Sequence, residues 1–146
     1  MKHVSILMVI LIVFIISSQN AFSRDIKKTK DGTVEFALKN LSQKAVFYSF
    51  KTSRGNKVTF FALLDRQDTP HVAFNACDVC YEAKRGYTVT PDSSTCNNCK
   101  NQYPTRFIGT KNLSGGCWPS YIPIKITNNK VVIEVGDLEK KAYLFP

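Results

Sequence analysis

The sequence has 146 residues, which is enough for one domain and short for two. Hydrophobic residues make up 44% of it, with ten Phe and six Tyr, so the composition excludes an intrinsically disordered protein and allows a hydrophobic core. The formal net charge is +9, but Lys and Arg are spread along the chain without the dense basic stripe of a nucleic-acid-binding surface, and we expect no nucleic-acid partner.

The first 23 residues have the pattern of an export signal. Lys2 precedes an apolar run over residues 4–16, and residues 21–23 (Ala-Phe-Ser) offer the small side chains that a signal peptidase recognises. Cleavage there would make Arg24 the first mature residue. A retained membrane anchor is the alternative, because a helix extended to Phe22 would just cross a hydrocarbon core of roughly 30 Å. In both cases we expect an extracytoplasmic protein, in the periplasm or at the cell surface, whose N-terminal segment meets the membrane.

A single domain is expected over residues 33–146, after a polar linker over residues 24–32. Apolar and polar residues alternate at the period of a β-strand in the first half of this domain. The third apolar stretch is hydrophobic on both faces, which is typical of a central strand. The pattern predicts strands over residues 34–38, 45–50, 58–64 and 72–76.

The end of the chain is expected to form a hairpin followed by a short helix. Apolar residues alternate over 122–126 and 131–135, and Asn128-Asn129 between them suits a tight turn. Asp137 is expected to cap a helix over residues 138–143. The predicted fold class is mainly β: a small antiparallel β domain with a cysteine-rich double-knuckle loop segment and a short C-terminal helix.

The five cysteines form the most informative pattern in the sequence. Cys77-x-x-Cys80 and Cys96-x-x-Cys99 are separated by fifteen residues. Two residues between thiolates let a tight turn aim both sulfurs at one ion, and two such turns complete a tetrahedron. We therefore predict that Cys77, Cys80, Cys96 and Cys99 bind a metal. Cys117 is either a small buried hydrophobe or an additional ligand beside them.

Other uses of these cysteines are less consistent with the pattern. Exported cysteines usually form disulfides, but the count is odd and a bond within Cys-x-x-Cys would close a very small loop. A c-type haem site is excluded because Tyr81 and Lys100, not His, follow the two pairs. Four sulfur ligands suit zinc, iron or an iron–sulfur cluster, and spacing alone favours zinc.

The sequence offers no catalytic constellation. His71 is the single histidine after the N-terminal segment, and a lone histidine at the start of a strand is more often a surface or satisfied core residue than a ligand. No Gly-rich phosphate loop and no Ser-His-Asp pattern is present. We therefore predict that the protein is not an enzyme.

Several motifs around the cysteines occur together in one known family. They are Phe60-Phe61-Ala62-Leu63, residues 72–81, residues 84–87, Cys96-Asn97-Asn98-Cys99, Ile108-Gly109 and Gly115-Gly116-Cys117. Together they resemble the FtrD-like membrane iron–sulfur domain, in which the two Cys-x-x-Cys pairs match presumed metal or cluster ligands and Cys117 matches a third cysteine motif. Trp118 stands where the family pattern has Asn.

The resemblance implies an extracytoplasmic protein of iron-uptake systems that include an iron permease. It implies electron transfer or iron handling, with the permease or another redox protein as partner. It also changes the favoured cofactor from zinc to an iron–sulfur cluster or iron. The alternative is a zinc-ribbon-like domain with a structural zinc, acting as a protein-interaction module.

Overall fold

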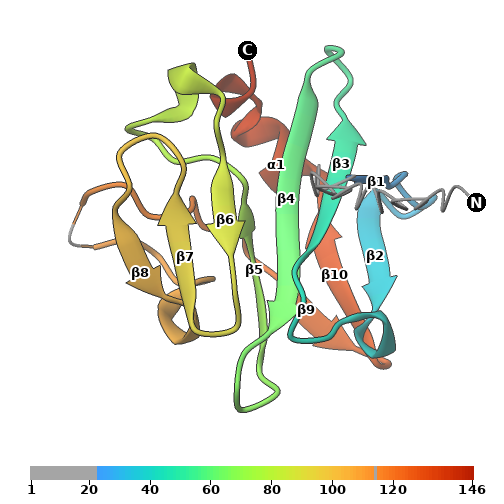
Figure 1. The fold of residues 1–146 in the computed structure, drawn as a ribbon. Helices are drawn as coiled ribbons and strands as arrows, with labels where there is room; N and C mark the ends of the chain where they lie inside the picture. Colours follow the sequence, from blue (N-terminus) through green and yellow to red (C-terminus); the bar gives the residue numbers. More distant parts are fainter. Residues whose placement is uncertain (1–22, 114) are drawn as a thin grey trace, which may run out of the picture.

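The computed structural model describes residues 23–113 and 115–146, and within them ten short strands form three small sheets (Figure 1). One sheet has the order β1 (Arg24–Asp25), β3 (Val46–Lys51), β4 (Lys57–Leu64), β5 (Pro70–Phe74). The second has the order β2 (Thr33–Ala37), β10 (Lys130–Glu134), β9 (Lys125–Thr127). The third has the order β6 (Tyr87–Val89), β7 (Ser93–Cys96), β8 (Gln102–Pro104). All pairs are antiparallel except β1 with β3, so the predicted mainly β class is confirmed.

Strand β4 is central, as its two apolar faces predicted. It pairs with β3 on one side and β5 on the other, and its side chains alternate between two hydrophobic clusters. Phe60 and Ala62 pack into the main core with β2 and β10, where Phe60 stacks on Phe36 and Tyr48. Phe61 and Leu63 face the opposite way, into the cluster that contains Cys77, Cys96 and Cys117. One strand therefore supports both the main core and the cysteine region.

The turn of the C-terminal hairpin is confirmed, but its first strand, β9, covers Lys125–Thr127 rather than residues 122–126, and the helix after it begins earlier than predicted. Asn128 and Asn129 have φ of 49° and 57°, the left-handed conformation of a tight hairpin turn. Helix α1 spans Val135–Lys140, with Glu134 rather than Asp137 at its N-cap. The predicted cap was wrong because β10 leads directly into the helix, where the Val135 N–H donates to the Gly32 carbonyl at 3.0 Å. Four short 3-10 helices complete the fold: Leu38–Asn40, Tyr81–Ala83, Thr105–Phe107 and Ala142–Leu144.

The start of the predicted linker belongs to a sheet. Arg24 and Asp25 form β1 beside β3, and the Ile26 N–H continues the pairing with the Ser49 carbonyl at 2.9 Å. Ile26 packs on the main core, so one apolar side chain attaches this polar segment to the domain. The predicted signal or anchor falls almost wholly on residues 1–22, outside the described residues. Across the described part of the chain, no helix has the length and apolar character to cross a membrane.

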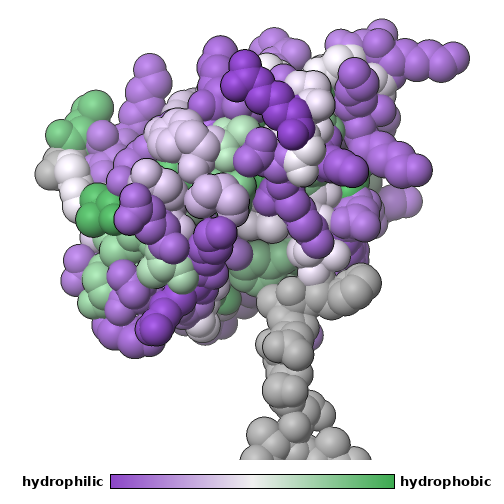
Figure 2. Space-filling view, turned by 90° about the horizontal axis from the view of Figure 1, so that it is seen from above, coloured by the Kyte–Doolittle hydropathy of each residue, from purple (hydrophilic) through white to green (hydrophobic). Residues whose placement is uncertain are grey.

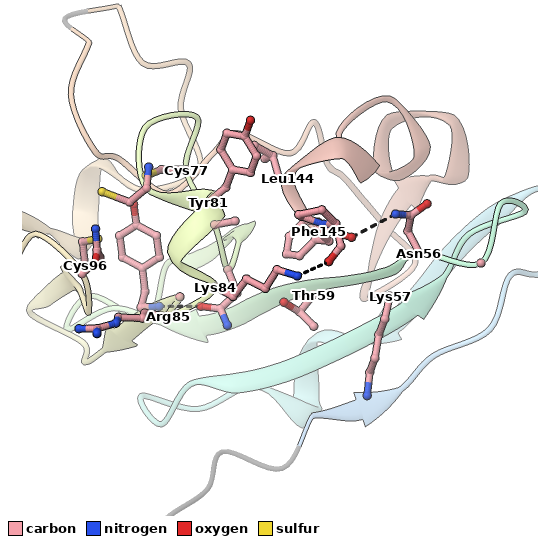
Figure 3. Close-up of a pocket in the computed structure, with 18 of the residues that line it drawn as sticks. Asn56, Lys57, Thr59, Cys77, Tyr81, Lys84, Arg85, Cys96, Leu144 and Phe145 are labelled. Atoms are coloured by element: carbon pink, nitrogen blue, oxygen red, sulfur yellow. Dashed lines mark hydrogen bonds between the residues drawn. The ribbon is translucent and has the colours of Figure 1, made fainter.

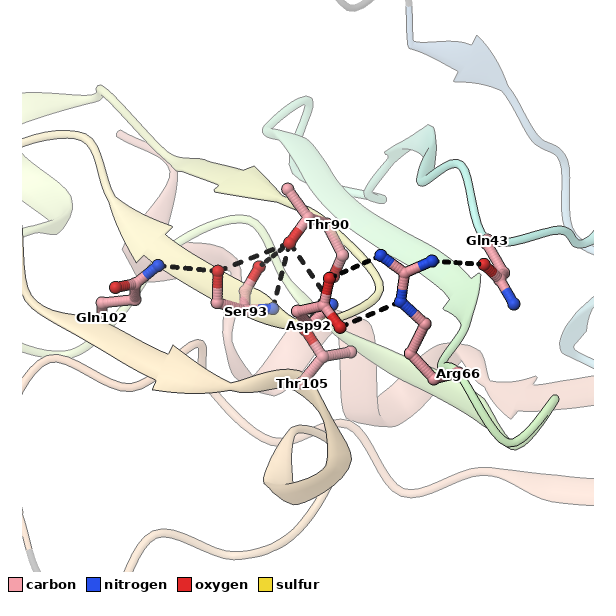
Figure 4. Close-up of polar contacts among 7 residues, drawn as sticks. All are labelled: Gln43, Arg66, Thr90, Asp92, Ser93, Gln102 and Thr105. Carbon is pink, nitrogen blue, oxygen red and sulfur yellow. Dashed lines mark hydrogen bonds and ion pairs between the residues drawn. The ribbon is translucent and has the colours of Figure 1, made fainter.

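The cysteine segment, predicted as loops, contains the β6-β7-β8 sheet. Its strands have three or four residues, too few to give an alternating pattern. A polar network joins this sheet to the central one (Figure 4). Arg66, after β4, donates to both carboxylate oxygens of Asp92 at 2.7 and 2.9 Å and to Gln43 at 3.2 Å. Because both charged side chains are more than half exposed, this pair contributes little to stability.

His71 is a buried core residue with both ring nitrogens bonded. Its Nδ1 lies 2.8 Å from the Ile108 carbonyl and its Nε2 lies 3.0 Å from Asp65 Oδ2. The other oxygen of Asp65 accepts the backbone N–H groups of Gln67 and Thr69. The pair therefore closes the β4–β5 turn, and His71 is absent from the cysteine group, in agreement with its predicted role.

The Asp65 pair makes stability depend on acid pH. The hydrogen bond from His71 is the main cause that lowers the pKa of Asp65 below 3.8, against the opposing effect of burial, with help from the two backbone donors. A lowered folded-state pKa stabilises the protein above the unfolded value, and this stabilisation is lost as pH falls through the folded value. We expect Asp65→Asn to be less stable than the parent near neutral pH and the difference to shrink as the pH falls below 3.8 and through the folded-state pKa, measured by urea unfolding. A constant difference across this range would contradict the assignment.

Candidate metal centre

The five cysteines come from three separate parts of the chain. Cys77 follows β5, and Cys80 precedes the 3-10 helix Tyr81–Ala83. Cys96 ends β7, Cys99 lies in the turn before β8, and Cys117 lies in the long loop before β9. All five are free thiols, and all but Cys80 and Cys99 are buried.

Four of the five sulfurs form a compact group. The Sγ atoms of Cys80, Cys96, Cys99 and Cys117 all lie within 4.8 Å of one another. Cys77 is outside this group but adjacent to it, with its Sγ 2.8 Å from that of Cys117. The sequence-predicted ligand set and this group therefore share three cysteines and differ in the fourth, and the predicted set stays a prediction.

The first Cys-x-x-Cys forms the expected tight turn. The Cys80 N–H donates to Cys77 Sγ at 3.2 Å, and Lys84 ends the following 3-10 helix in the left-handed conformation, with φ of 54°. In the second pair, the Lys100 N–H closes the turn on the Cys96 carbonyl at 2.9 Å, and Lys100 has φ of 66°. The two turns are closed differently: the left-handed residue comes four residues after Cys80 in the first and directly after Cys99 in the second.

Two tyrosines hold the loop that carries Cys117. The Tyr87 hydroxyl donates to the Cys117 carbonyl at 2.7 Å, and the Cys117 N–H donates to the Tyr103 hydroxyl at 3.0 Å. The Tyr103 ring stacks on Trp118 with 4.2 Å between centroids. Trp118 therefore has a packing role beside the site. Sequence reasoning gave neither tyrosine a role at the site, although Tyr87 lies in the motif over residues 84–87, since nothing in the local pattern indicates a contact so far along the chain.

Asp78, between Cys77 and Cys80, ties the first turn to the rest of the domain. Its carboxylate accepts hydrogen bonds from Ser120 Oγ at 2.7 Å, from Lys141 Nζ at 2.8 Å and from the Tyr143 hydroxyl. Partial burial raises the pKa of Asp78, but these hydrogen bonds outweigh it and bring the pKa to about 2. The first cysteine turn is thus fixed both to the Cys117 loop and to the C-terminal segment.

The thiols differ in how readily they lose a proton. Mainly through a hydrogen bond from the Asn101 backbone, the pKa of the exposed Cys99 is lowered to about 7. Burial raises the pKa of Cys117 above its ordinary value of 9.0. A metal binds the thiolate form of cysteine, so it would displace the proton from Cys99 easily. The proton of Cys117 would leave only because the positive charge of the metal offsets the cost of a buried thiolate.

The compact group has the donor chemistry of a four-thiolate metal site. Metal–sulfur bonds of about 2.3 Å at tetrahedral angles place sulfurs about 3.8 Å apart, within the observed limit. A single zinc or iron ion would fit with little movement. An iron–sulfur cluster puts several atoms among the cysteine sulfurs, so it would require them to separate further. The residues present fit a metal, and the four-sulfur set does not by itself identify which one.

Gly86 is expected to be needed for the shape of the site. It has φ of 59°, and a Cβ there would lie 2.6 Å from the side-chain N and O of Asn75, whose Oδ1 accepts the Tyr87 N–H. Gly86→Ala should destabilise the protein by the left-handed strain of about 1–2 kcal/mol plus about 1 kcal/mol for the displaced hydrogen bond. Gly32→Ala is the control, because Gly32 has φ of 78° with open space around it. If urea unfolding gave equal losses of unfolding free energy for the two variants, the Asn75 side chain would be able to move aside without cost.

Comparison with known proteins agrees with this centre. A family model described as "Membrane iron-sulfur containing protein FtrD-like" matches residues 41–145. The chain belongs to the FtrD-like family. The match covers all five cysteines of this FtrD-like protein, and it confirms the resemblance drawn from the motifs. Neither the comparison with curated proteins nor that with solved structures gave a match.

Proposed function

We propose that this FtrD-like protein is an extracytoplasmic iron–thiolate protein that transfers electrons or handles iron beside an iron-uptake permease. The observation that carries the proposal is the group of four cysteine sulfurs in a chain of an iron–sulfur family. The bound iron would be an iron–sulfur cluster or a single ion. The protein would have no enzymatic activity of its own, and residues 1–23 would direct it to, or hold it at, the outer side of the membrane.

The position of the sulfurs suits exchange with a partner. Cys99 is exposed and Cys80 is half-buried, so one edge of the group reaches the protein surface while Cys96 and Cys117 hold it from within. Lys84, Arg85 and Lys100 flank the two turns and are exposed. Their charges would favour the reduced, more negative state of a thiolate centre and attract an acidic partner.

A structural zinc is the second candidate, favoured by the spacing of the sulfurs. A zinc ion held by four thiolates fits the 4.8 Å limit without rearrangement, and the protein surface would then carry the function as an interaction module. Removal of such a zinc would unfold the cysteine region, whereas an iron centre would also show a redox-dependent spectrum.

The deciding experiment is the metal content and visible spectrum of the full-length protein purified without oxygen. We expect iron, and a visible absorption that bleaches on reduction with dithionite. Sulfide measured in the same sample separates a cluster from a single iron ion. Stoichiometric zinc without colour would replace the redox proposal with the structural one. A metal-free protein with oxidised cysteines would overturn both.

A further inference from the structure

A cavity of about 590 Å³ lies against the cysteine centre. It is formed where the β3–β4 turn, the segment after β5 and the C-terminal residues meet, at the end of the molecule that carries the C-terminus (Figure 1). This end of the surface is mainly hydrophilic (Figure 2). The volume is within the usual range for small-molecule sites, about 300–1,000 Å³.

The cavity has a strongly cationic lining. No Asp or Glu side chain is among its described lining residues. Four basic residues contribute to it: Arg54, Lys57, Lys84 and Arg85. Lys84 Nζ donates to the Pro146 carbonyl at 2.7 Å, which places its charge across the opening (Figure 3). Arg54 interacts with Glu139 outside the cavity. Lys57 points away from the other labelled lining residues (Figure 3). Within the described part of the chain, Lys84 and Arg85 form no ion pair with an Asp or Glu side chain. Concave surfaces with an excess of one sign of charge concentrate small ions of the opposite charge.

The walls and floor suit an organic ligand rather than a bare ion. Tyr81, Tyr87, Leu144 and Phe145 supply aromatic and aliphatic surface, as in most small-molecule sites. Three cysteines also line the cavity: Cys77, Cys80 and Cys96. Two of these, Cys80 and Cys96, belong to the four-sulfur group. A ligand in the cavity would therefore contact the edge of the metal centre itself.

We propose that this cavity binds a small organic anion with two or more carboxylate groups, either free or as the chelate of a trivalent metal ion. Its carboxylates pair with Lys84 and Arg85, and its carbon skeleton packs on the aromatic wall. The anion binds through the cationic lining, whereas the metal is held by the cysteine sulfurs. Anion binding and metal content can therefore fail independently.

The test is calorimetric titration of the full-length protein with citrate and, separately, with its redox-inert gallium(III) chelate, with glycerol as the uncharged control ligand. The double variant Lys84→Gln/Arg85→Gln removes two cations from the lining. Arg106→Gln/Lys125→Gln removes two exposed cations from outside it and has the same net charge. We expect the first variant to bind about tenfold more weakly than the parent and the second to bind as the parent does, with one site per chain. Metal content, measured in each sample, reports on the cysteine centre separately.

Each outcome bears on the proposal. Tighter binding of citrate would identify the free anion as the ligand, and tighter binding of the gallium complex would identify the chelate; both support the site if the lining variant weakens it. Equal weakening in the two double variants would show non-specific attraction by net charge and overturn the proposal. Absence of binding by either ligand up to about 10 mM in the folded parent protein would overturn it as well.

Discussion

The Cys117→Ser variant is expected to lose more than about half of its bound metal, whereas Cys77→Ser retains most of it. The reason is geometric: Cys117 Sγ lies within 4.8 Å of the sulfurs of Cys80, Cys96 and Cys99, and Cys77 is outside this group. A serine hydroxyl is a harder and weaker ligand for zinc or iron than a thiolate. The measurement is metal per chain by elemental analysis after equal dialysis, with circular dichroism to establish that each variant is folded.

This pair of variants also decides between two ligand sets. The sequence-predicted set of Cys77, Cys80, Cys96 and Cys99 requires the opposite order, with metal lost in Cys77→Ser and kept in Cys117→Ser. Cys99→Ser is the positive control, because Cys99 belongs to both sets. Equal loss in all five single variants would contradict both sets. It would indicate a centre that shares five sulfurs, as the 2.8 Å contact of Cys77 with Cys117 would permit.

Phe60→Ala is expected to cost about 3–5 kcal/mol of the free energy of unfolding. Phe60 is completely buried on the main-core face of β4, where its ring packs on two other aromatic rings. Because small domains are stable by only about 5–15 kcal/mol, this one change removes a large part of the total. The measurement is urea unfolding followed by tryptophan fluorescence.

Two further alanine variants make the result specific. Phe61→Ala removes an equally buried ring from the opposite face, in the cluster with the cysteines, and should lower both stability and metal retention. Phe107→Ala removes a ring that is 47% exposed and should have little effect. If Phe60→Ala caused no more loss than Phe107→Ala, the main core would not be packed as described.

Local patterns were sufficient to predict the elements whose side chains alternate over several residues. The strands β2 to β5 and β10 belong to this class, because burial on one or two faces imposes a period on the sequence. The turn at Asn128-Asn129 was predicted from its residue types instead. The strands β6, β7 and β8 do not. They are short, so the side chains that they place in the cysteine-side cluster, such as Tyr87 and Cys96, are too few to give a period in the sequence.

The cysteine centre was predictable in part for a similar reason. The spacing of Cys77-x-x-Cys80 and Cys96-x-x-Cys99 specifies two local turns, and local turns can be inferred from sequence. The position of Cys117 depends on how a distant loop folds back over the site, held by the hydroxyls of Tyr87 and Tyr103. Such tertiary contacts leave no periodic signal, so its membership of the four-sulfur group required the structure.

The placement of β4 between two hydrophobic clusters has a consequence for hydrogen exchange. Its backbone amides are bonded to strands on both sides, and its two faces are covered by different parts of the molecule. Water can reach these amides only when both clusters open, so their exchange reports the global unfolding free energy. A ligand that stabilises only the cysteine-side cluster, such as a metal, raises this free energy. It must therefore slow exchange throughout β4, although the other face of this strand lies in the main core, which the ligand does not touch.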